Sequence, residues 1–181
     1  MNVVKLVNNA KKGNKNALLN LVMSEKDAFY RLAYTYMKNE QDSLDALSDM
    51  IVILYEKIDQ LQKPESFYSW SKTILVNQCK TLLKNKQKVV FVDDYIAVNE
   101  LQNVDGLKDH CFHQSERKMD LNVMLASLNS EQREAIQLKY FHDLNYETIA
   151  QIMNVSIGTV KSRIHYGMKK LQERYGGGQD E

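Results

Sequence analysis

The sequence predicts an all-α protein in which two small helical domains are joined by an irregular acidic linker, with a helix-turn-helix in the second domain. Three observations support this fold class. Hydrophobic residues make up 44% of the chain, while proline occurs once and glycine seven times, a composition that favours helices over turn-rich sheets. Apolar residues recur at steps of three and four along most of the chain. A length of 181 residues is enough for one ordinary domain or two small ones.

The first domain, residues 1–88, is predicted to begin with short amphipathic helices. Their spacing places one at Val3–Lys11 and, after the break at Gly13-Asn14, another at Asn16–Val22. Ser24 with Asp27 resembles the N-cap of the following helix. That helix carries an apolar face that we expect to pack in the core: Phe29, Leu32, Ala33 and Tyr36.

The next helix is predicted to begin at Asp42, with Asp45 in the first turn, where the helix dipole favours negative charge. Its expected inward stripe is Leu44, Leu47, Ile51, Leu54 and Ile58. A separate face combines acids with one apolar residue: Asp42, Asp45, Asp49, Val52 and Glu56. On physical grounds alone, a solvated acidic face explains this pattern better than a docking surface does.

A loop is predicted at Lys63-Pro64-Glu65-Ser66, because Pro64 excludes helix continuation and Ser66 is a suitable cap for the next helix. In that helix we expect Phe67, Trp70, Ile74 and Leu82 to pack inward, with Trp70 in the core. Lysines gather on the opposite side, with no acid between residues 66 and 88: Lys72, Lys80, Lys84, Lys86 and Lys88. Local charge is therefore more informative than the net charge of +1.

Residues 89–115 are predicted to form the linker, because they show no sustained period and acids dominate from Asp93 to Asp109. Within it, His110, Cys111 and His113 could in principle ligate a metal. Without a second matching cluster, a variable linker segment is the better account, and we expect no metal site. Cys79 and Cys111 lie far apart without a paired spacing, which fits reduced thiols.

The second domain, residues 116–175, is followed by a tail at 176–181 that we expect to be flexible. It begins with residues expected to face mostly inward: Met119, Leu121, Val123, Met124, Leu125 and Leu128. The most informative stretch of the chain is Asn145–Tyr166. Asn145 is expected to cap a first helix, Asn154 to end it in the left-handed conformation, and Ser156 to cap a second.

This second helix has two different faces. The expected buried stripe is Ile157, Val160, Ile164, Met168 and Leu171. The opposite face carries Gly158, Thr159, Ser162, Tyr166 and Lys169, flanked by Lys161, Arg163, His165 and Lys170. Small residues with cations along the edges suit a helix that enters the major groove of DNA while its rim pairs with phosphates. A solvated helical hairpin is the alternative, but cap, turn, stripe and face together favour DNA binding.

Residues 146–163 resemble the promoter-recognition domain of bacterial sigma factors, particularly the extracytoplasmic-function (ECF) group, in which (S/Y)-x-x-I-A-x-x-(L/M)-x-(V/I)-S-x-G-T-V-K-S-R recurs. The resemblance extends to Leu128–Phe141 and, near the N-terminus, to Ala10–Asn14 and Tyr30–Tyr34. Two residues depart from the family's pattern. Ser48 replaces a long amide in a segment linked to polymerase contact, and Asn154 replaces a frequent glycine.

The resemblance implies a transcription initiation factor that binds core RNA polymerase and recognises two promoter elements. The implied minus-thirty-five contacts are Ser156, Gly158, Thr159, Lys161, Ser162, Arg163 and Tyr166. The implied minus-ten contacts, near a base turned out of the stack, are Lys63, Tyr68, Lys72, Asn77, Lys80 and Lys84. The implied polymerase contacts are Asp42, Asp45, Asp49, Met50, Val52 and Glu56. An anti-sigma protein is implied as a further partner.

Other function classes are less well supported. The sequence has no nucleophile with an adjacent base, no glycine-rich phosphate loop and no paired metal motif, so we expect neither an enzyme nor a cofactor. A stand-alone dimeric helix-turn-helix regulator is the alternative to a sigma factor, and a protein-binding adaptor is a third class. No run of about eighteen apolar residues and no charged-then-apolar leader occurs, so we expect no membrane insertion and a cytoplasmic location.

Overall fold

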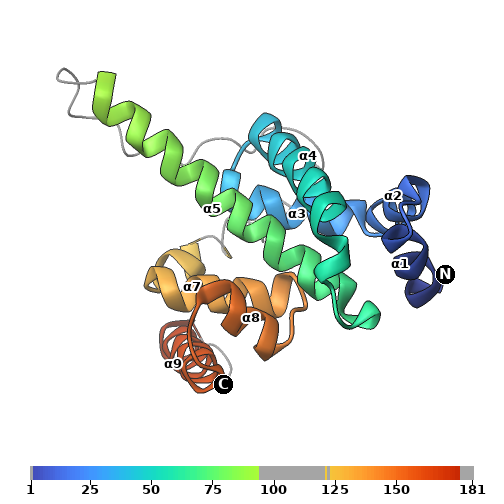
Figure 1. The fold of residues 1–181 in the computed structure, drawn as a ribbon. Helices are drawn as coiled ribbons and strands as arrows, with labels where there is room; N and C mark the ends of the chain where they lie inside the picture. The colour runs from blue at the N-terminus through green and yellow to red at the C-terminus, as the bar shows by residue number, and fades with distance from the viewer. Residues whose placement is uncertain (1, 94–120, 122, 176–181) are drawn as a thin grey trace, which may run out of the picture. The chain divides into compact units, whose positions relative to one another are not determined.

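The computed structural model describes residues 2–93, 121 and 123–175 (Figure 1). All regular structure within these residues is helical, which confirms the predicted fold class. The chain divides into two compact units, residues 1–106 and 107–181. Residues 2–93 thus belong to the first unit, and residues 121 and 123–175 belong to the second.

The first unit begins with α1 (Val3–Lys11), α2 (Lys15–Ser24) and α3 (Lys26–Met37). Asn2 and Asn14 cap the first two helices, because their side-chain oxygens accept from the backbone N–H groups of Lys5 and Ala17. The predicted cap at Ser24 is wrong. Ser24 is the last residue of α2, and its hydroxyl donates to the carbonyl of Leu21 at 2.8 Å.

Helix α4 (Glu40–Lys57) begins earlier than the predicted start at Asp42. Asn39 is its N-cap and accepts from the N–H of Asp42 at 2.9 Å. The buried face of α4 consists of Ser43, Ala46, Met50 and Leu54. The predicted stripe is therefore wrong at Leu44, which is 44% exposed, while Leu47 and Ile51 are only half-buried. The buried face was not predicted from hydrophobicity, because two of the residues that pack inward, Ser43 and Ala46, are small.

Two short 3₁₀ turns, η1 (Ile58–Gln60) and η2 (Pro64–Ser66), lead into α5 (Phe67–Asp93). Because η2 runs directly into α5, Ser66 is a turn residue and not the predicted N-cap. The buried face of α5 is Phe67, Ser71, Leu75, Val76 and Cys79. Trp70, Ile74 and Leu82, predicted to face the core, are only half-buried. Helix α5 packs along α3 and α4, and Figure 1 shows the three side by side.

The second unit has helical residues at 121 and 123–126, then α7 (Ser130–Ile136), the π-helical turn η3 (Gln137–Phe141), α8 (Tyr146–Met153) and α9 (Ile157–Tyr175). Its core is Leu125, Leu128, Ala135, Ile136, Leu138, Leu144, Ile149, Ile152, Val160 and Ile164. Val123 was expected to face inward but is 58% exposed. Leu121 and Met124 are half-buried, and Met119 lies outside the described residues.

The start of the second unit is fastened by the guanidinium of Arg133. It donates to the backbone carbonyls of Leu125 at 2.9 Å, Leu128 at 3.0 Å and Ala126 at 3.3 Å. These carbonyls lie at and just beyond the end of the preceding helical segment, and that of Leu125 also accepts from the backbone N–H of Leu128 at 3.1 Å. Arg133 therefore ties that segment to α7.

Helix α9 approaches α7 through Gly167. A Cβ atom at this position would come within 2.7 Å of Cδ1 of Ile136 and 3.3 Å of Cβ of Gln132. A Cβ at this position would require the side chain of Ile136 to move and Gln132 to give way slightly, so Gly167 allows the two helices to approach closely.

We predict that Gly167→Ala lowers the free energy of unfolding by about 1–3 kcal/mol, because the added methyl group overpacks the contact with Ile136. Gly158→Ala is the matched control, since its Cβ would meet only Oγ of Ser156 at an ordinary 3.6 Å and would improve helix propensity. Denaturant titration followed by circular dichroism measures both changes. Equal stability of the two variants would contradict this account of the α7–α9 contact.

Candidate nucleic-acid interface

The predicted helix-turn-helix is confirmed in its caps and its turn. The side chain of Asn145 accepts from the N–H of Thr148 at 2.8 Å at the start of α8. Asn154 ends α8 in the left-handed conformation, with φ of 52° and ψ of 49°. Oγ of Ser156 then accepts from the N–H of Thr159 at 3.1 Å at the start of α9. Two residues, Asn154 and Val155, therefore separate α8 from the capping serine.

Helix α9 buries Val160, Ile164 and Gly167. The predicted stripe is wrong at its ends, because Ile157 is 39% and Met168 is 41% exposed. Gly167, and not the neighbouring Met168, faces α7 at this end of the buried side. The expected open face is present, with Gly158, Ser162, Tyr166 and Lys169 all exposed and Thr159 half-buried.

Two cations flank this open face on opposite sides. Arg163 lies on the side of α7, where its guanidinium pairs with the carboxylate of Glu131 at 2.8 Å, and its side chain is only 19% exposed. On the side of α8, the ammonium group of Lys161 lies 5.6 Å from the centre of the Tyr146 ring. Both residues were predicted contacts, and they differ: Arg163 is largely buried in its ion pair, whereas Lys161 is exposed.

Tyr146 was not among the predicted contacts. Its ring also receives the ammonium group of Lys139 at 5.0 Å, so two cations lie over one aromatic ring. Another aromatic residue, Tyr166, is exposed and lies edge-on to the ring of His165 with 5.4 Å between centroids. The fold brings Lys139 of η3 and Lys161 of α9 beside Tyr146 of α8.

The predicted minus-ten residues fall on separate faces of the first unit. Asn77, Lys80 and Lys84 are spaced by three and four residues, which places them on one face of α5. Lys80 is half-buried, with its ammonium group 5.9 Å from the centre of the Tyr36 ring. Lys63 is exposed in the loop before η2.

Tyr68 and Lys72 face a different part of the first unit. Oη of Tyr68 is hydrogen-bonded to Oγ of Ser24 at 2.8 Å, and Lys72 pairs with Glu25 at 3.0 Å. The side chain of Lys72 is only 15% exposed. Both side chains thus hold α5 against the junction of α2 and α3.

The predicted polymerase surface on α4 is only partly exposed. Met50, one of the predicted contacts, is fully buried on the inner face of α4. Asp49 is half-buried and accepts from the side-chain amide of Gln78 at 2.8 Å. Asp45, Val52 and Glu56 are exposed.

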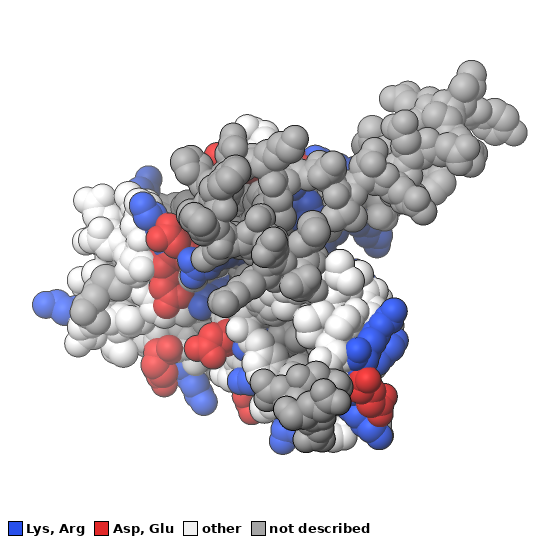
Figure 2. All heavy atoms as spheres, turned by 180° about the vertical axis from the view of Figure 1, so that it is seen from behind, with Lys and Arg blue, Asp and Glu red and all other residues white. Residues whose placement is uncertain are grey.

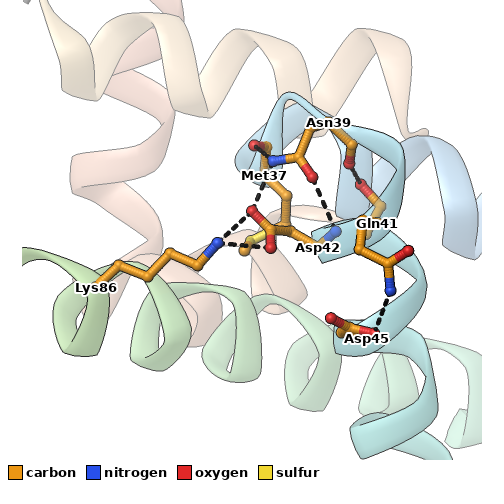
Figure 3. A network of polar contacts seen from close by, with 7 residues as sticks. Met37, Asn39, Gln41, Asp42, Asp45 and Lys86 are labelled. Atoms are coloured by element: carbon orange, nitrogen blue, oxygen red, sulfur yellow. Dashed lines mark hydrogen bonds and ion pairs between the residues drawn. The ribbon is translucent and has the colours of Figure 1, made fainter.

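Asp42 belongs to a polar network that joins α4 to α5 (Figure 3). Lys86 of α5 donates to both carboxylate oxygens of Asp42 at 2.6 Å, and the side-chain amide of Asn39 donates to one of them at 2.6 Å. These bonds, Lys86 first, hold the pKa of the Asp42 carboxyl below its ordinary value. Gln41 donates to Asp45 at 3.1 Å on the neighbouring turn.

Two apolar residues on the exposed side of α4 were not among the predicted polymerase contacts. Leu44 is 44% and Tyr55 is 47% exposed, and both share this side with Val52, which is 56% exposed. Positions 44, 52 and 55 follow the helical repeat, but Leu44 had been assigned to the core and Tyr55 to neither face. Ser48 lies among them and donates its hydroxyl to the carbonyl of Leu44 at 2.9 Å.

Charges of both signs lie close together on the molecule. On the face shown in Figure 2, acidic and basic side chains of the described residues lie next to one another. Among the described residues, no group of three or more His, Cys, Asp and Glu side chains is suited to hold a metal ion. The cluster of His110, Cys111 and His113 lies outside those residues. No described helix combines the length and the apolar character needed to cross a membrane.

Comparisons with protein families match both units. Residues 21–89 match the model of sigma-70 region 2, and residues 118–171 match the model of sigma-70 region 4. The chain is 30% identical over 162 residues to the RNA polymerase sigma factor SigV of Bacillus subtilis, covering 90% of this chain and 93% of SigV. It is 26% identical over 181 residues to the ECF RNA polymerase sigma factor SigW of the same organism, covering 96% and 97%.

Solved structures show the same fold. CnrH, in complex with the cytosolic domain of CnrY, aligns with a TM-score of 0.66 at 19% identity, covering 98% of this chain and 99% of CnrH. The sigma factor RpoE of Bartonella quintana, in complex with the anti-sigma factor NepR, aligns with a TM-score of 0.64 at 22% identity, covering 88% and 97%. At these identities, the alignments establish the fold alone.

We predict that Lys86→Gln raises the pKa of Asp42 toward its ordinary value, because the strongest of its hydrogen bonds is lost. A lowered pKa stabilises the fold above the ordinary aspartate value, and this contribution disappears as pH falls through the lowered one. Carbon-13 NMR titration of the Asp42 carboxyl measures the shift. Lys84→Gln, one half-turn earlier on α5, is the control and should leave Asp42 unchanged. An unaltered titration in Lys86→Gln would refute the ion pair.

Proposed function

Because this chain belongs to the extracytoplasmic-function (ECF) group of RNA polymerase sigma factors, we propose roles for its individual surfaces. The protein binds core RNA polymerase and promoter DNA and directs promoter-specific transcription initiation. It is not an enzyme, and the chemistry of RNA synthesis belongs to the polymerase. The order of regions 2 and 4 along the chain carries this conclusion, since a stand-alone regulator has no need of region 2.

The proposed domains are residues 1–88 for core polymerase and minus-ten binding, 89–115 as linker, 116–175 for minus-thirty-five binding and 176–181 as a tail. The family models, which cover 21–89 and 118–171, support the assignments of residues 1–88 and 116–175. A cytoplasmic location follows from the role of the protein, because core polymerase acts on chromosomal DNA.

The minus-thirty-five element is contacted by the open face of α9. Gly158, Ser162 and Tyr166 are exposed on this face and are free to approach base edges in the major groove. Ser156 and Thr159 at the start of α9 are hydrogen-bonded to each other at 2.9 Å and offer hydroxyl groups to a nearby phosphate. Lys161 and Arg163 flank the face and neutralise phosphates on either side.

The minus-ten element is contacted by the face of α5 that carries Asn77, Lys80 and Lys84, together with Lys63 in the preceding loop. These side chains follow the backbone of an opened strand, and a flipped base is held near the loop. Tyr68 and Lys72 take part only if their bonds to Ser24 and Glu25 are exchanged for DNA.

Core polymerase docks on the exposed side of α4. This surface combines carboxylates of Asp45 and Glu56 with apolar side chains of Leu44, Val52 and Tyr55. Charged groups around an apolar centre are typical of protein interfaces, where the apolar residues supply most of the affinity. Asp42 and Asp49, held by Lys86 and Gln78, act from the edge of this surface.

An anti-sigma factor is a further proposed partner. The support is that RpoE of Bartonella quintana was solved in complex with the anti-sigma factor NepR and shares this fold. Such a partner prevents initiation by covering the polymerase surface, the DNA surfaces or both.

Tyr166→Ala should reduce initiation at the protein's own promoters roughly tenfold, because Tyr166 is 61% exposed at the centre of the open face of α9. Tyr175→Ala is the matched control, a tyrosine on the same helix that is 39% exposed near its end. Each full-length variant is combined with core polymerase and genomic DNA, and the 5′ ends of the transcripts are sequenced. Retained initiation by Tyr166→Ala would remove Tyr166 from the DNA surface, whereas failure of the unmodified protein to direct any start sites would refute the function itself.

Val52→Glu should weaken binding to core polymerase at least about tenfold, because it places a charge at the apolar centre of the α4 surface. Val4→Glu makes the same change at a residue of α1 that is 43% exposed and should bind normally. Co-purification with core polymerase at several protein concentrations gives the two affinities. If both variants bound as the unmodified protein does, the docking surface would lie elsewhere.

A further inference from the structure

The ion pair of Arg163 with Glu131 changes what α9 offers to DNA. Arg163 is a predicted minus-thirty-five contact, yet its side chain is 19% exposed and its guanidinium lies 2.8 Å from a carboxylate oxygen of Glu131. The Glu131 side chain is 60% exposed, so the pair lies at the rim of the open face of α9. Glu131 lies in the first turn of α7, where the helix dipole favours a negative charge.

Holding α9 against α7 does not explain this pair. The two helices already pack against each other, including at the contact between Gly167 and Ile136. A partly exposed ion pair adds little stability to such a packed contact. Its larger effect is on the charge that the rim of α9 presents to an approaching DNA backbone.

A carboxylate and a phosphate bind the same fork of a guanidinium group. Glu131 therefore occupies the donors that Arg163 would use for a phosphate. When DNA arrives, Arg163 must leave Glu131 or share its donors, and in both cases the Glu131 carboxylate lies close enough to repel the phosphate.

We propose that Glu131 is a specificity-determining residue that restrains Arg163 and so suppresses binding to DNA lacking a promoter element. This inference rests on the proposed minus-thirty-five role of α9. Mixed-sequence DNA offers α9 only phosphates, which compete poorly with Glu131. A correct element adds base contacts through the face of Ser162 and Tyr166, and these contacts compensate for breaking the pair.

The opposite flank of α9 is built differently. Lys161 lies over the Tyr146 ring, and in the described part of the chain no carboxylate pairs with it. This flank is open to phosphate at all times, while the flank of Arg163 is restrained by an acid. Only one of the two cationic edges thus depends on Glu131.

The test measures binding of the full-length protein to a short fluorescent duplex of mixed sequence, by anisotropy over a range of salt concentrations. Glu131→Gln should bind severalfold more tightly, with a salt dependence steeper by about one unit, because Arg163 becomes free to pair with a phosphate. Glu173→Gln is the matched control. It makes the same charge change on α9, where Glu173 pairs with Lys169 only at a long 3.8 Å.

The same substitution in an Arg163→Gln background separates competition from general electrostatics. If Glu131 acts through Arg163, Glu131→Gln should there have no larger effect than Glu173→Gln. An equal gain in both backgrounds would overturn the proposal. So would weaker binding by Glu131→Gln with a lower melting temperature, which is the result of a purely structural pair. Start-site sequencing with the unmodified protein reports on the proposed function independently.

Discussion

Helix starts in this protein depend on one recurring hydrogen bond. In five helices an asparagine side chain accepts from the backbone N–H three residues later, at Asn2, Asn14, Asn39, Asn129 and Asn145. Ser156 makes the same bond at the start of α9. Each cap contributes about 1 kcal/mol, and it also fixes the residue at which the helix begins. The exposed side of α4 and the open face of α9 both lie on helices that begin at such caps.

The caps also explain how much of the fold could be predicted. The pattern around Asn145, Asn154 and Ser156 was interpretable because cap and turn residues follow one another with no competing candidate. At α4, by contrast, several polar residues compete, and Asn39 forms the cap while Asp42 accepts from Lys86. Local sequence could not decide between them, because the ion pair depends on α5 lying alongside α4.

Predictions of buried faces failed where small residues carry the packing. Ser43 and Ser71 are fully buried, and each donates its hydroxyl to a backbone carbonyl four residues earlier in the chain, which satisfies it without a tertiary partner. Gly167 allows α9 to approach α7 more closely than a large side chain would permit. Hydrophobic periodicity does not mark such small positions as buried, and on α4 it placed Leu44 in the core although Leu44 is 44% exposed. The open face of α9 was predicted better, because its exposed residues form the helix surface opposite Val160 and Ile164.

The ion pairs within each unit are the part of the site that could not be predicted from the sequence. Lys72, Lys86 and Arg163 lie on helices that bear the candidate DNA surfaces, yet they pair with Glu25, Asp42 and Glu131. If these cations contact phosphates, such pairing lowers the affinity of each unit for arbitrary DNA. Weak DNA binding by each unit suits a factor that recognises its promoter with two such units. Joined through the polymerase, two weak modules reach high affinity only when both elements are correctly spaced, because binding of the first raises the effective concentration of the second. A strongly basic unit would bind everywhere and lose this discrimination among the many competing sites of a genome.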